Sequence, residues 1–425
     1  MNEVATRVDR THAVDNPEAG GAATARPPAL MGLARLMSMA FEGADLAPLA
    51  VELIARASAD ESDADALMDL SIVLQLQGHR DLGLATQALA LKVSRVYELP
   101  SANATAVRLL AIMAAGDLMT NTPLPFLIEG SDIALCMLYI LPGETIPTDL
   151  PAHDVVFIAV SEADSTHALL AALAGALPTW TKPVVNPPER IVRTSRAQAH
   201  TLLAGATGVC MPVSARATRE QLQQLSSGGL VLRDMLRDGA FPLIVRPVGS
   251  HAGRELQKVD CAHELRPYLE ATAAAEFFIS SFVDYRGNDG LFRKYRVVLI
   301  DGIPHAGHMG ISTHWMIHYL NAGMSDSAGK RAEEEAFMRN FETGFACRHD
   351  SALQAVSKRV GLDYLVIDCA ETAAGELLIF EIDGGAVVHS MDPAGLFPYK
   401  RPQMEKLFAA FRAMLVRAIT IDRFV

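Results

Sequence analysis

The sequence predicts a multidomain chain of mixed α/β and α+β class that is preceded by an all-helical region. Three patterns predict this. Between residues 29 and 120, apolar residues recur at three- and four-residue spacing, which is typical of amphipathic helices. Between 121 and 194, short apolar strands alternate with helices, as in a small α/β domain with a partly parallel sheet. From 195 to 425, strands and helices mix as in an α+β domain.

Composition and length restrict the class of protein further. A chain of 425 residues is too long for one core, and its content of 50% hydrophobic and 20% charged residues supports several cores. The net charge of -12 and pI near 5.5 argue against a general nucleic-acid binder. Five scattered cysteines without a Cys-x-x-Cys pair argue against a disulfide framework or zinc site. No run suits a membrane span or signal peptide, so we expect a cytoplasmic protein.

The N-terminal part is expected to begin with a tail and continue as helices. Residues 1–28 are rich in Ala, Gly, Thr, Asp and Pro without periodicity, which predicts a disordered tail. Helices are predicted at residues 49–59, 63–77, 81–97 and 104–115. Residues 64–99 resemble a degenerate tetratricopeptide-type repeat, a fold that would offer a surface to a peptide or protein partner, although an ordinary helical bundle explains the pattern equally well.

The rest of the chain alternates predicted strands and helices. Strands are predicted at residues 133–141, 155–160, 184–185, 209–213, 243–245, 277–283, 295–300, 365–369 and 378–382. Helices are predicted at residues 165–176, 196–204, 219–237, 333–345, 351–360 and 404–416.

Near the C-terminus, two apolar strands joined by the polar turn 371–376 carry three carboxylates. Asp368 is expected to end the first strand, and Glu381 and Asp383 stand two residues apart on the second, so these two share a face. Carboxylates that converge there would repel one another without a cation, and their hard oxygens suit Mg2+. The plainer interpretation is a solvated hairpin with acidic tips.

A strand over residues 243–245 leads through Arg246 into a loop of small residues. Glycines let a backbone approach a polyphosphate closely, and Arg246 could pair with phosphate oxygens in a bidentate way. Gly/Ser turns after strands are common, so an ordinary turn is an equal alternative. The predicted phosphate-binding loop residues are Gly249, Ser250, His251 and Gly253.

Two later strands complete the candidate site. The strand at 277–283 could present its backbone to a purine edge, with Asp284 near ribose hydroxyls, although a plain core strand is the simpler interpretation. The next strand opens with three cations in four residues, Arg293, Lys294 and Arg296. Such charges could neutralise carboxylates and a transferring phosphoryl group.

The order of these pieces resembles the ATP-grasp superfamily, nearest to its glutathione-synthetase and ribosomal-protein-modifying branch. The resemblance covers residues from about 133 to 416, and residues 184–196 look like the preceding domain's entry into the nucleotide site. It implies ATP and Mg2+ (or Mn2+) as cofactors. The positions implied for nucleotide binding are Arg196, Arg246, Gly249, Ser250, His251, Gly253, Ser281, Phe282, Val283 and Asp284, those for metal are Asp368, Glu381 and Asp383, and those for catalysis are Arg296 and Arg293.

Five positions depart from the family's pattern. Arg196 and Arg246 stand where it has lysines, which keeps the charge and changes the geometry. Ser280 and Ser281 replace a Gln-Glu pair, and Asp383 replaces an asparagine. The pattern along the chain predicts a tail (1–28) and a helical domain (29–120), which the resemblance leaves unexplained, and the resemblance implies a pre-ATP-grasp domain (121–194) and an ATP-grasp domain (195–425).

The activity that the resemblance implies is amide formation between a carboxylate and an amine through an acyl phosphate. The substrate would be an amino acid, a small peptide or a peptide side chain, and the chain would form a homodimer as many superfamily members do. The first alternative is a helical-repeat scaffold that carries a nucleotide-sensing, non-catalytic ATP-grasp domain. The second is a kinase acting on a small molecule.

Four histidines and Trp315 gather within residues 305–319. His314 and His318 have the i,i+4 spacing that would bind a metal on a helix, but no adjacent Glu completes a His-Glu-x-x-His motif. We expect this segment to line a substrate pocket or to pack as aromatic core.

Overall fold

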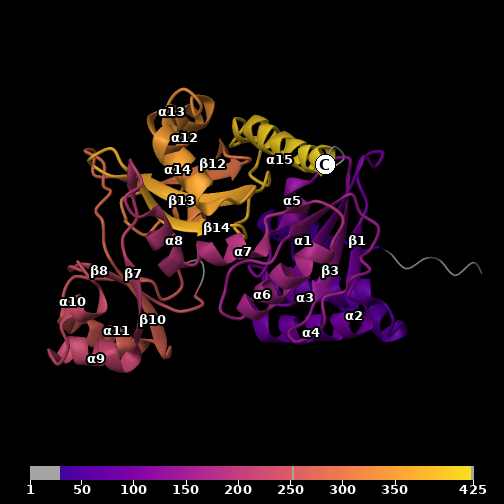
Figure 1. The fold of residues 1–425 in the computed structure, drawn as a ribbon, viewed down its shortest axis with the longest axis horizontal. Helices are drawn as coiled ribbons and strands as arrows, with labels where there is room; N and C mark the ends of the chain where they lie inside the picture. The colour runs from indigo at the N-terminus through magenta and orange to yellow at the C-terminus, as the bar shows by residue number, and fades with distance from the viewer. Residues whose placement is uncertain (1–28, 251–252, 423–425) are drawn as a thin grey trace, which may run out of the picture.

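The computed structural model describes residues 29–250 and 253–422, which form three sheets with helices packed around them (Figure 1). The predicted tail at 1–28 and the predicted loop residue His251 lie outside these residues. At the N-terminal end, helices α1 (Gly32–Phe41), α2 (Ala47–Ala59), α3 (Ala64–Leu76) and α4 (Arg80–Val93) share a small core that includes Leu36, Leu53 and Val73. The predicted helices at 49–59 and 63–77 are confirmed, while the one at 81–97 ends at Val93.

The first sheet has the order β1-β3-β2-β4-β5, and only its edge strand β1 is antiparallel to its neighbour. Its strands are β1 (Val96–Leu99), β2 (Val107–Ala114), β3 (Ile133–Ile140), β4 (Val155–Ile158) and β5 (Val184–Val185). The helix predicted at 104–115 is wrong, because that segment is the central strand β2. Its residues are buried on both faces except Arg108, so the run lacks the alternation that marks a half-buried strand.

The short helices α5 (Leu124–Leu127), α6 (His167–Ala176) and α7 (Pro188–Ile191) follow strands of this sheet, whereas α8 (Arg196–Leu203) packs against α14 (Asp350–Val360) and β14 (Leu377–Asp383). The long C-terminal helix α15 (Lys400–Asp422) joins the first sheet to the third. Its Phe411 ring lies 5.9 Å from the Phe157 ring of β4 and 5.6 Å from the Tyr364 ring, and all three side chains are fully buried. Part of the core is therefore continuous between the two sheets.

The second sheet is antiparallel, has the order β7-β10-β8-β9 and possesses a core of its own. Its strands are β7 (Ser214–Thr218), β10 (Glu276–Ser281), β8 (Leu243–Pro247) and β9 (Gln257–Val259), covered by α9 (Arg219–Ser227), α10 (Leu232–Met235) and α11 (Leu265–Ala271). The single helix predicted at 219–237 is divided, because Gly228 ends α9 with φ +80°, a left-handed conformation that favours glycine.

The third sheet has the order β12-β11-β13-β14-β6. Its strands are β12 (Ile303–Ser312), β11 (Phe292–Ile300), β13 (Tyr364–Glu371), β14 (Leu377–Asp383) and β6 (Val209–Cys210), with helices α12 (Ala328–Arg339), α13 (Phe345–Arg348) and α14 (Asp350–Val360). Asp301 and Gly302 join β11 to β12 with positive φ, as a two-residue hairpin requires. The prediction that Asp368 ends its strand is wrong, because β13 continues to Glu371.

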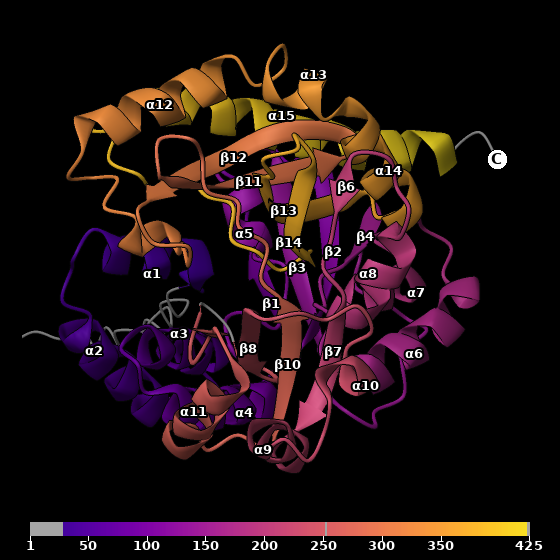
Figure 2. The same cartoon turned by 90° about the vertical axis from the view of Figure 1, so that its left-hand side faces the viewer.

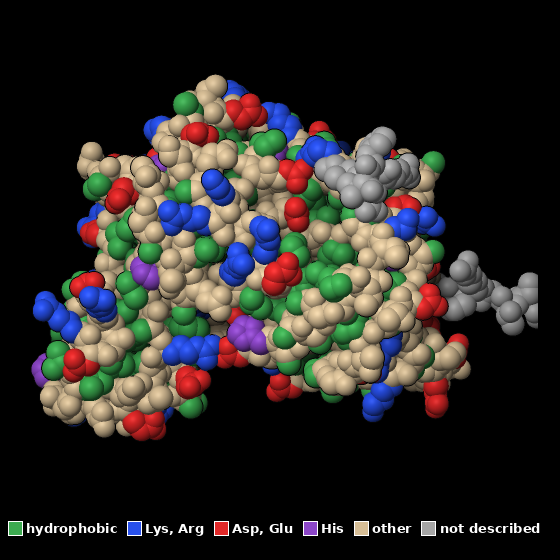
Figure 3. All heavy atoms as spheres, viewed as in Figure 1, with side chains coloured by type: hydrophobic (Ala, Val, Ile, Leu, Met, Phe, Trp, Pro, Cys, Tyr) green, Lys and Arg blue, Asp and Glu red, His purple; other side chains and the backbone are tan. Residues whose placement is uncertain are grey.

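The second sheet forms a lobe at the lower left of Figure 1, below the third sheet, and the first sheet with the N-terminal helices lies to the right. In the view turned by 90°, helix α1 lies close to the chain that follows β12 (Figure 2). The space-filling view shows a notch between the second-sheet lobe and the N-terminal part, and charges of both signs scattered over this face (Figure 3). Within residues 29–250 and 253–422, no helix combines the length and apolarity of a membrane span.

Candidate nucleotide and substrate site

A cavity of about 630 Å³ lies between the second and third sheets and extends to helix α1. Strands β8 and β10 line one side, and β11, β12, β13 and β14 line the other. Ionisable side chains from six elements, the loop after β12 and the segment after β14 reach it: Arg196, Arg246, Lys294, Arg296, His308, His318, Asp368, Glu381, Asp383 and His389. This combination of many charges with a large concave space makes the cavity the candidate site.

Two β-bulges aim these side chains at the cavity. The register of β11 and β12 shifts after the pair Arg296–His308, so that Gly307 is the extra residue. A Cβ on Gly307 would lie 2.9 Å from the Arg296 side chain, so glycine permits this close approach. The register of β13 and β14 shifts after the pair Asp368–Glu381, with Phe380 extra. Bulges re-aim side chains in this way beside functional sites.

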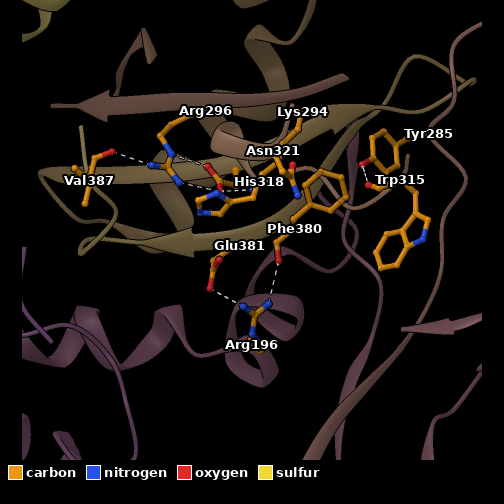
Figure 4. Close-up of polar contacts among 11 residues, drawn as sticks. Arg196, Tyr285, Lys294, Arg296, Trp315, His318, Asn321, Phe380, Glu381 and Val387 are labelled. Atoms are coloured by element: carbon orange, nitrogen blue, oxygen red, sulfur yellow. Dashed lines mark hydrogen bonds and ion pairs between the residues drawn. The ribbon is translucent and has the colours of Figure 1, made fainter. Parts of the chain in front are cut away.

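Asp368 is held by two cations of the neighbouring strand. Arg296 donates to both of its carboxylate oxygens at 2.8 and 3.0 Å, and the Lys294 Nζ lies 2.7 Å away. Burial alone would raise the pKa of Asp368, but Arg296 and Lys294 hold that pKa well below its ordinary value. Arg296 also donates to the carbonyl oxygen of Val387 at 2.8 Å (Figure 4).

A second ionic group lies across the cavity. Arg196, at the start of α8, donates to Glu381 at 2.5 Å and to the Phe380 carbonyl at 3.3 Å (Figure 4). Burial would raise the pKa of Glu381, but Arg196 and Arg246 lower it. Burial and then the nearby Arg196 lower the pKa of Arg246 to about 10. The cations therefore repel one another, and an anion between them would relieve that repulsion.

The pKa of Asp383 is shifted in the opposite direction, upward. Burial and then the charge of Glu381 raise its pKa to about 6, and the hydrogen bond from the Gly385 N–H at 2.7 Å only partly offsets this. A cation beside Glu381 and Asp383 would stabilise both carboxylates, so their oxygens fit Mg2+. Asp368, however, is occupied by Lys294 and Arg296. Within the described ranges, no group of three His, Cys, Asp or Glu side chains is arranged to hold a metal ion.

The other end of the cavity is an apolar slot. Ser281, Phe282 and Val283, the positions predicted to bind a base, line the cavity here. The Phe282 and Trp315 rings meet edge-to-face at 5.7 Å, and the Lys258 ammonium lies 5.2 Å from the Phe282 ring centroid. The remaining slot residues are Met211, Ile244, Leu256, Phe278, Leu378 and Phe380. A flat aromatic ring fits such a slot.

Some predicted site residues lie elsewhere. Arg293 points away from Arg296 across the pleat and pairs with Asp289 and Glu333. Asp284 pairs with Arg286 at 3.2 Å and is not among the residues that line the cavity. Of the described small-residue loop, Gly253 lines the cavity, whereas Gly249 and Ser250 do not, although Ser250 accepts a hydrogen bond from Arg246 through its backbone carbonyl.

The sequence reasoning left several lining residues unassigned. Lys294 lies two residues from Arg296 on the same strand face, so strand alternation could have selected it instead of Arg293. The histidine segment is strand β12 followed by a loop and a 3-10 turn (Tyr319–Asn321), so His314 and His318 do not share a helix on which they could bind a metal together. His308 and His318 do line the cavity, and burial, with the nearby cations, lowers the pKa of both.

No protein-family model and no curated protein matches the chain. Solved structures give weak likenesses. D-alanine–D-alanine ligases from Bacillus anthracis (complexed with ATP) and Coxiella burnetii are 15% and 13% identical, with TM-scores of 0.43 and 0.45. They cover 74% and 75% of this chain, and 99% and 96% of their own. A RimK domain ATP-grasp protein from Sphaerobacter thermophilus is 13% identical, covers 72% of this chain and 99% of its own, and has a TM-score of 0.40.

Proposed function

We propose that the chain is an ATP-dependent ligase that joins a carboxylate to an amine through an acyl phosphate. The observation that supports it is the division of one cavity into two ends. An apolar slot suited to a base continues into a cluster of four cations and three carboxylates: Arg196, Arg246, Lys294, Arg296, Asp368, Glu381 and Asp383. A nucleoside triphosphate with its metal has this same division of apolar ring and compensated charge.

The proposal assigns a role to each of these charged side chains. Arg196 and Arg246 bind phosphate oxygens, which replaces their mutual repulsion by attraction. Arg296 and Lys294 neutralise the charge that develops when a substrate carboxylate oxygen attacks the γ-phosphorus and ADP leaves. The amine then attacks the acyl carbon and inorganic phosphate departs. Mg2+ would be held by Glu381 and Asp383, where it neutralises phosphate charge.

A nucleotide-binding protein without catalysis is the second candidate, and one observation favours it. Both oxygens of Asp368 are engaged by Arg296 and Lys294, so the three predicted metal ligands are not gathered as one cluster. A site in this state would bind a nucleotide through its cations without assembling the full metal centre.

Phosphate release from Mg-ATP separates the two candidates. The full chain is assayed with amino acids and short peptides, singly and in pairs, and products are read by mass spectrometry. A ligase releases phosphate only with a competent pair and gives a product lighter than their sum by one water. Glu381→Gln should abolish that release, while Glu376→Gln, on the same hairpin but away from the cavity, should leave it unchanged. Mg-ATP binding without release for any pair would support the second candidate.

A further inference from the structure

Helix α1 forms part of the cavity wall, beside the charged cluster. Met37, Ala40 and Phe41 stand at i, i+3 and i+4 on this helix and all three line the cavity. Leu36, one residue earlier, is fully buried in the small N-terminal core. The helix therefore uses one face for packing and a second face for the cavity wall.

This wall is fixed at both ends of the helix. The buried Asp69 of α3 accepts hydrogen bonds from the backbone N–H groups of Met31 at 2.8 Å and Gly32 at 3.0 Å. At the other end, the Phe41 ring lies 5.7 Å from the ring of His389, which belongs to the segment after β14. Helix α1 is thus attached to the same segment that the charged cluster holds.

The segment after β14 forms the facing wall. The hydrogen bond from Arg296 to the Val387 carbonyl places this wall next to the reacting end of the cavity. Burial lowers the pKa of His389 to about 4, so its ring is neutral at pH 7. Its Nδ1 accepts from the Met391 N–H at 3.1 Å, which assigns the ring proton to Nε2. The residues of this segment that line the cavity, Ala386, Val387, His389 and Met391, therefore carry no charge.

We propose that the part of the cavity between α1 and the segment after β14 binds the apolar side chain of an amino-acid or short-peptide substrate whose reacting group faces Arg296. The chamber is formed by Met37, Ala40, Phe41, Leu76, Met119 and Met391. The proposal rests on the ligase function and gives its substrate class.

Two physical arguments support an apolar occupant. A charged or amide side chain placed against these residues would lose its hydration without gaining a partner, whereas an aliphatic or aromatic one gains by burial. The lining side chains contributed by residues 29–120 are all apolar. Three of the six chamber residues are methionines, whose flexible thioethers adapt to different apolar shapes.

The test measures binding of side chains matched in shape. Calorimetry with the full chain and Mg-ADP compares leucine with asparagine and aspartate, and valine with threonine, each as free amino acid and as the end residue of an alanyl dipeptide. We expect the apolar member to bind at least about tenfold more tightly, the discrimination a hydrophobic pocket gives. Equal affinities, preference for the polar member, or no binding by any apolar member would overturn the proposal.

A charge placed in the chamber gives a second, independent readout. Met37→Lys should weaken leucine binding and strengthen aspartate binding. Val51→Lys, at a position of α2 that is 68% exposed, places the same charge on the N-terminal helices outside the cavity and should change neither. Thermal melting and Mg-ADP affinity show that each variant is folded. Unchanged selectivity in folded Met37→Lys would overturn the proposal.

The two proposals fail in different ways. Apolar amino acids that bind, while no pair of substrates releases phosphate from Mg-ATP, would refute the ligase function and retain the apolar chamber. Phosphate release that requires a substrate with a charged or amide side chain, and ignores its apolar counterpart, would retain the ligase and refute the chamber.

Discussion

Replacing Asp368 by asparagine tests whether the charges of the cavity form one balanced cluster. The carboxylate is 8% exposed and bridges Arg296 and Lys294, whose side chains are 19% and 23% exposed. Asparagine keeps the shape and removes the charge, so it leaves two cations side by side without their counter-ion. The change should therefore destabilise the folded protein through uncompensated charge.

The size of the loss follows from burial. Removing one partner of a buried ion pair costs about 3–5 kcal/mol, and the partial exposure of both cations puts this site near ~3 kcal/mol. For a chain of 425 residues, an unfolding entropy of about 2.1 cal/mol/K per residue converts that loss into about 3–4 °C of melting temperature. Because the folded pKa of Asp368 is depressed, its contribution is present above the unfolded pKa near 4 and falls only in more acidic solution.

The assay is scanning calorimetry at pH 7 with a matched control. Asp132 and Arg412 form an equally bidentate pair at 2.7 and 2.6 Å, but their side chains are 23% and 41% exposed. Asp132→Asn should lower the melting temperature by less than about 1 °C, because exposed pairs contribute little. Inorganic tripolyphosphate should recover part of the loss in Asp368→Asn by binding the freed cations. A shift no larger than that of Asp132→Asn would refute the reasoning.

Three further results are expected. Arg246→Ala should weaken Mg-ATP binding by about tenfold or more in calorimetry, because a charged hydrogen-bond donor to phosphate is lost; unchanged affinity would contradict its predicted role. In EDTA, the melting temperature of Asp383→Asn should rise relative to that of the unmutated chain between pH 4 and about 6. Above pH 6 the difference between the two should stay constant. The folded pKa of about 6 exceeds the unfolded value, so stability is lost as Asp383 ionises, and a pH-independent difference would argue against this. Asp69→Ala should cost about 1–3 kcal/mol, since it leaves one buried and one partly buried N–H group at the start of α1 unpaired, and should speed amide exchange in that helix; unchanged exchange would show that Asp69 does not fix the helix.

The hairpin was the part of the site that sequence could predict. Strand alternation placed Glu381 and Asp383 on one face, and the structure pairs Asp368 with Glu381 across the hairpin. The ion pairs of Asp368 could not be predicted from strand alternation. Arg296 stands 72 residues earlier in the chain, and only the pairing of β11 with β13 brings it opposite Asp368. Local patterns fix which residues share a face, while sheet order decides which charges meet.

The error at β2 has a similar cause. A strand buried on both faces has no polar alternate positions, and a run of Leu, Ala, Ile and Met then matches helical spacing as well as a strand. Its identity depends on lying between β3 and β4, which is tertiary information. The prediction of Arg293 beside Arg296 has the same cause. Three cations in four residues indicate a basic segment, and only the two faces of the strand separate Lys294 from Arg293.

In helix α1, the spacing of apolar residues does not distinguish a face that packs in a core from a face that lines a cavity. The face with Leu36 and the face with Met37 and Phe41 are both apolar, and from sequence each predicts burial against a core. In the structure Leu36 is fully buried, whereas Met37, Ala40 and Phe41 are only partly buried and border the cavity. A packed core and an apolar binding chamber are built from the same residue types, because both remove hydrocarbon from water. What separates them is unfilled volume beside a charged reacting site, which arises only when segments more than 250 residues apart in the chain, such as α1 and the loop after β14, come together.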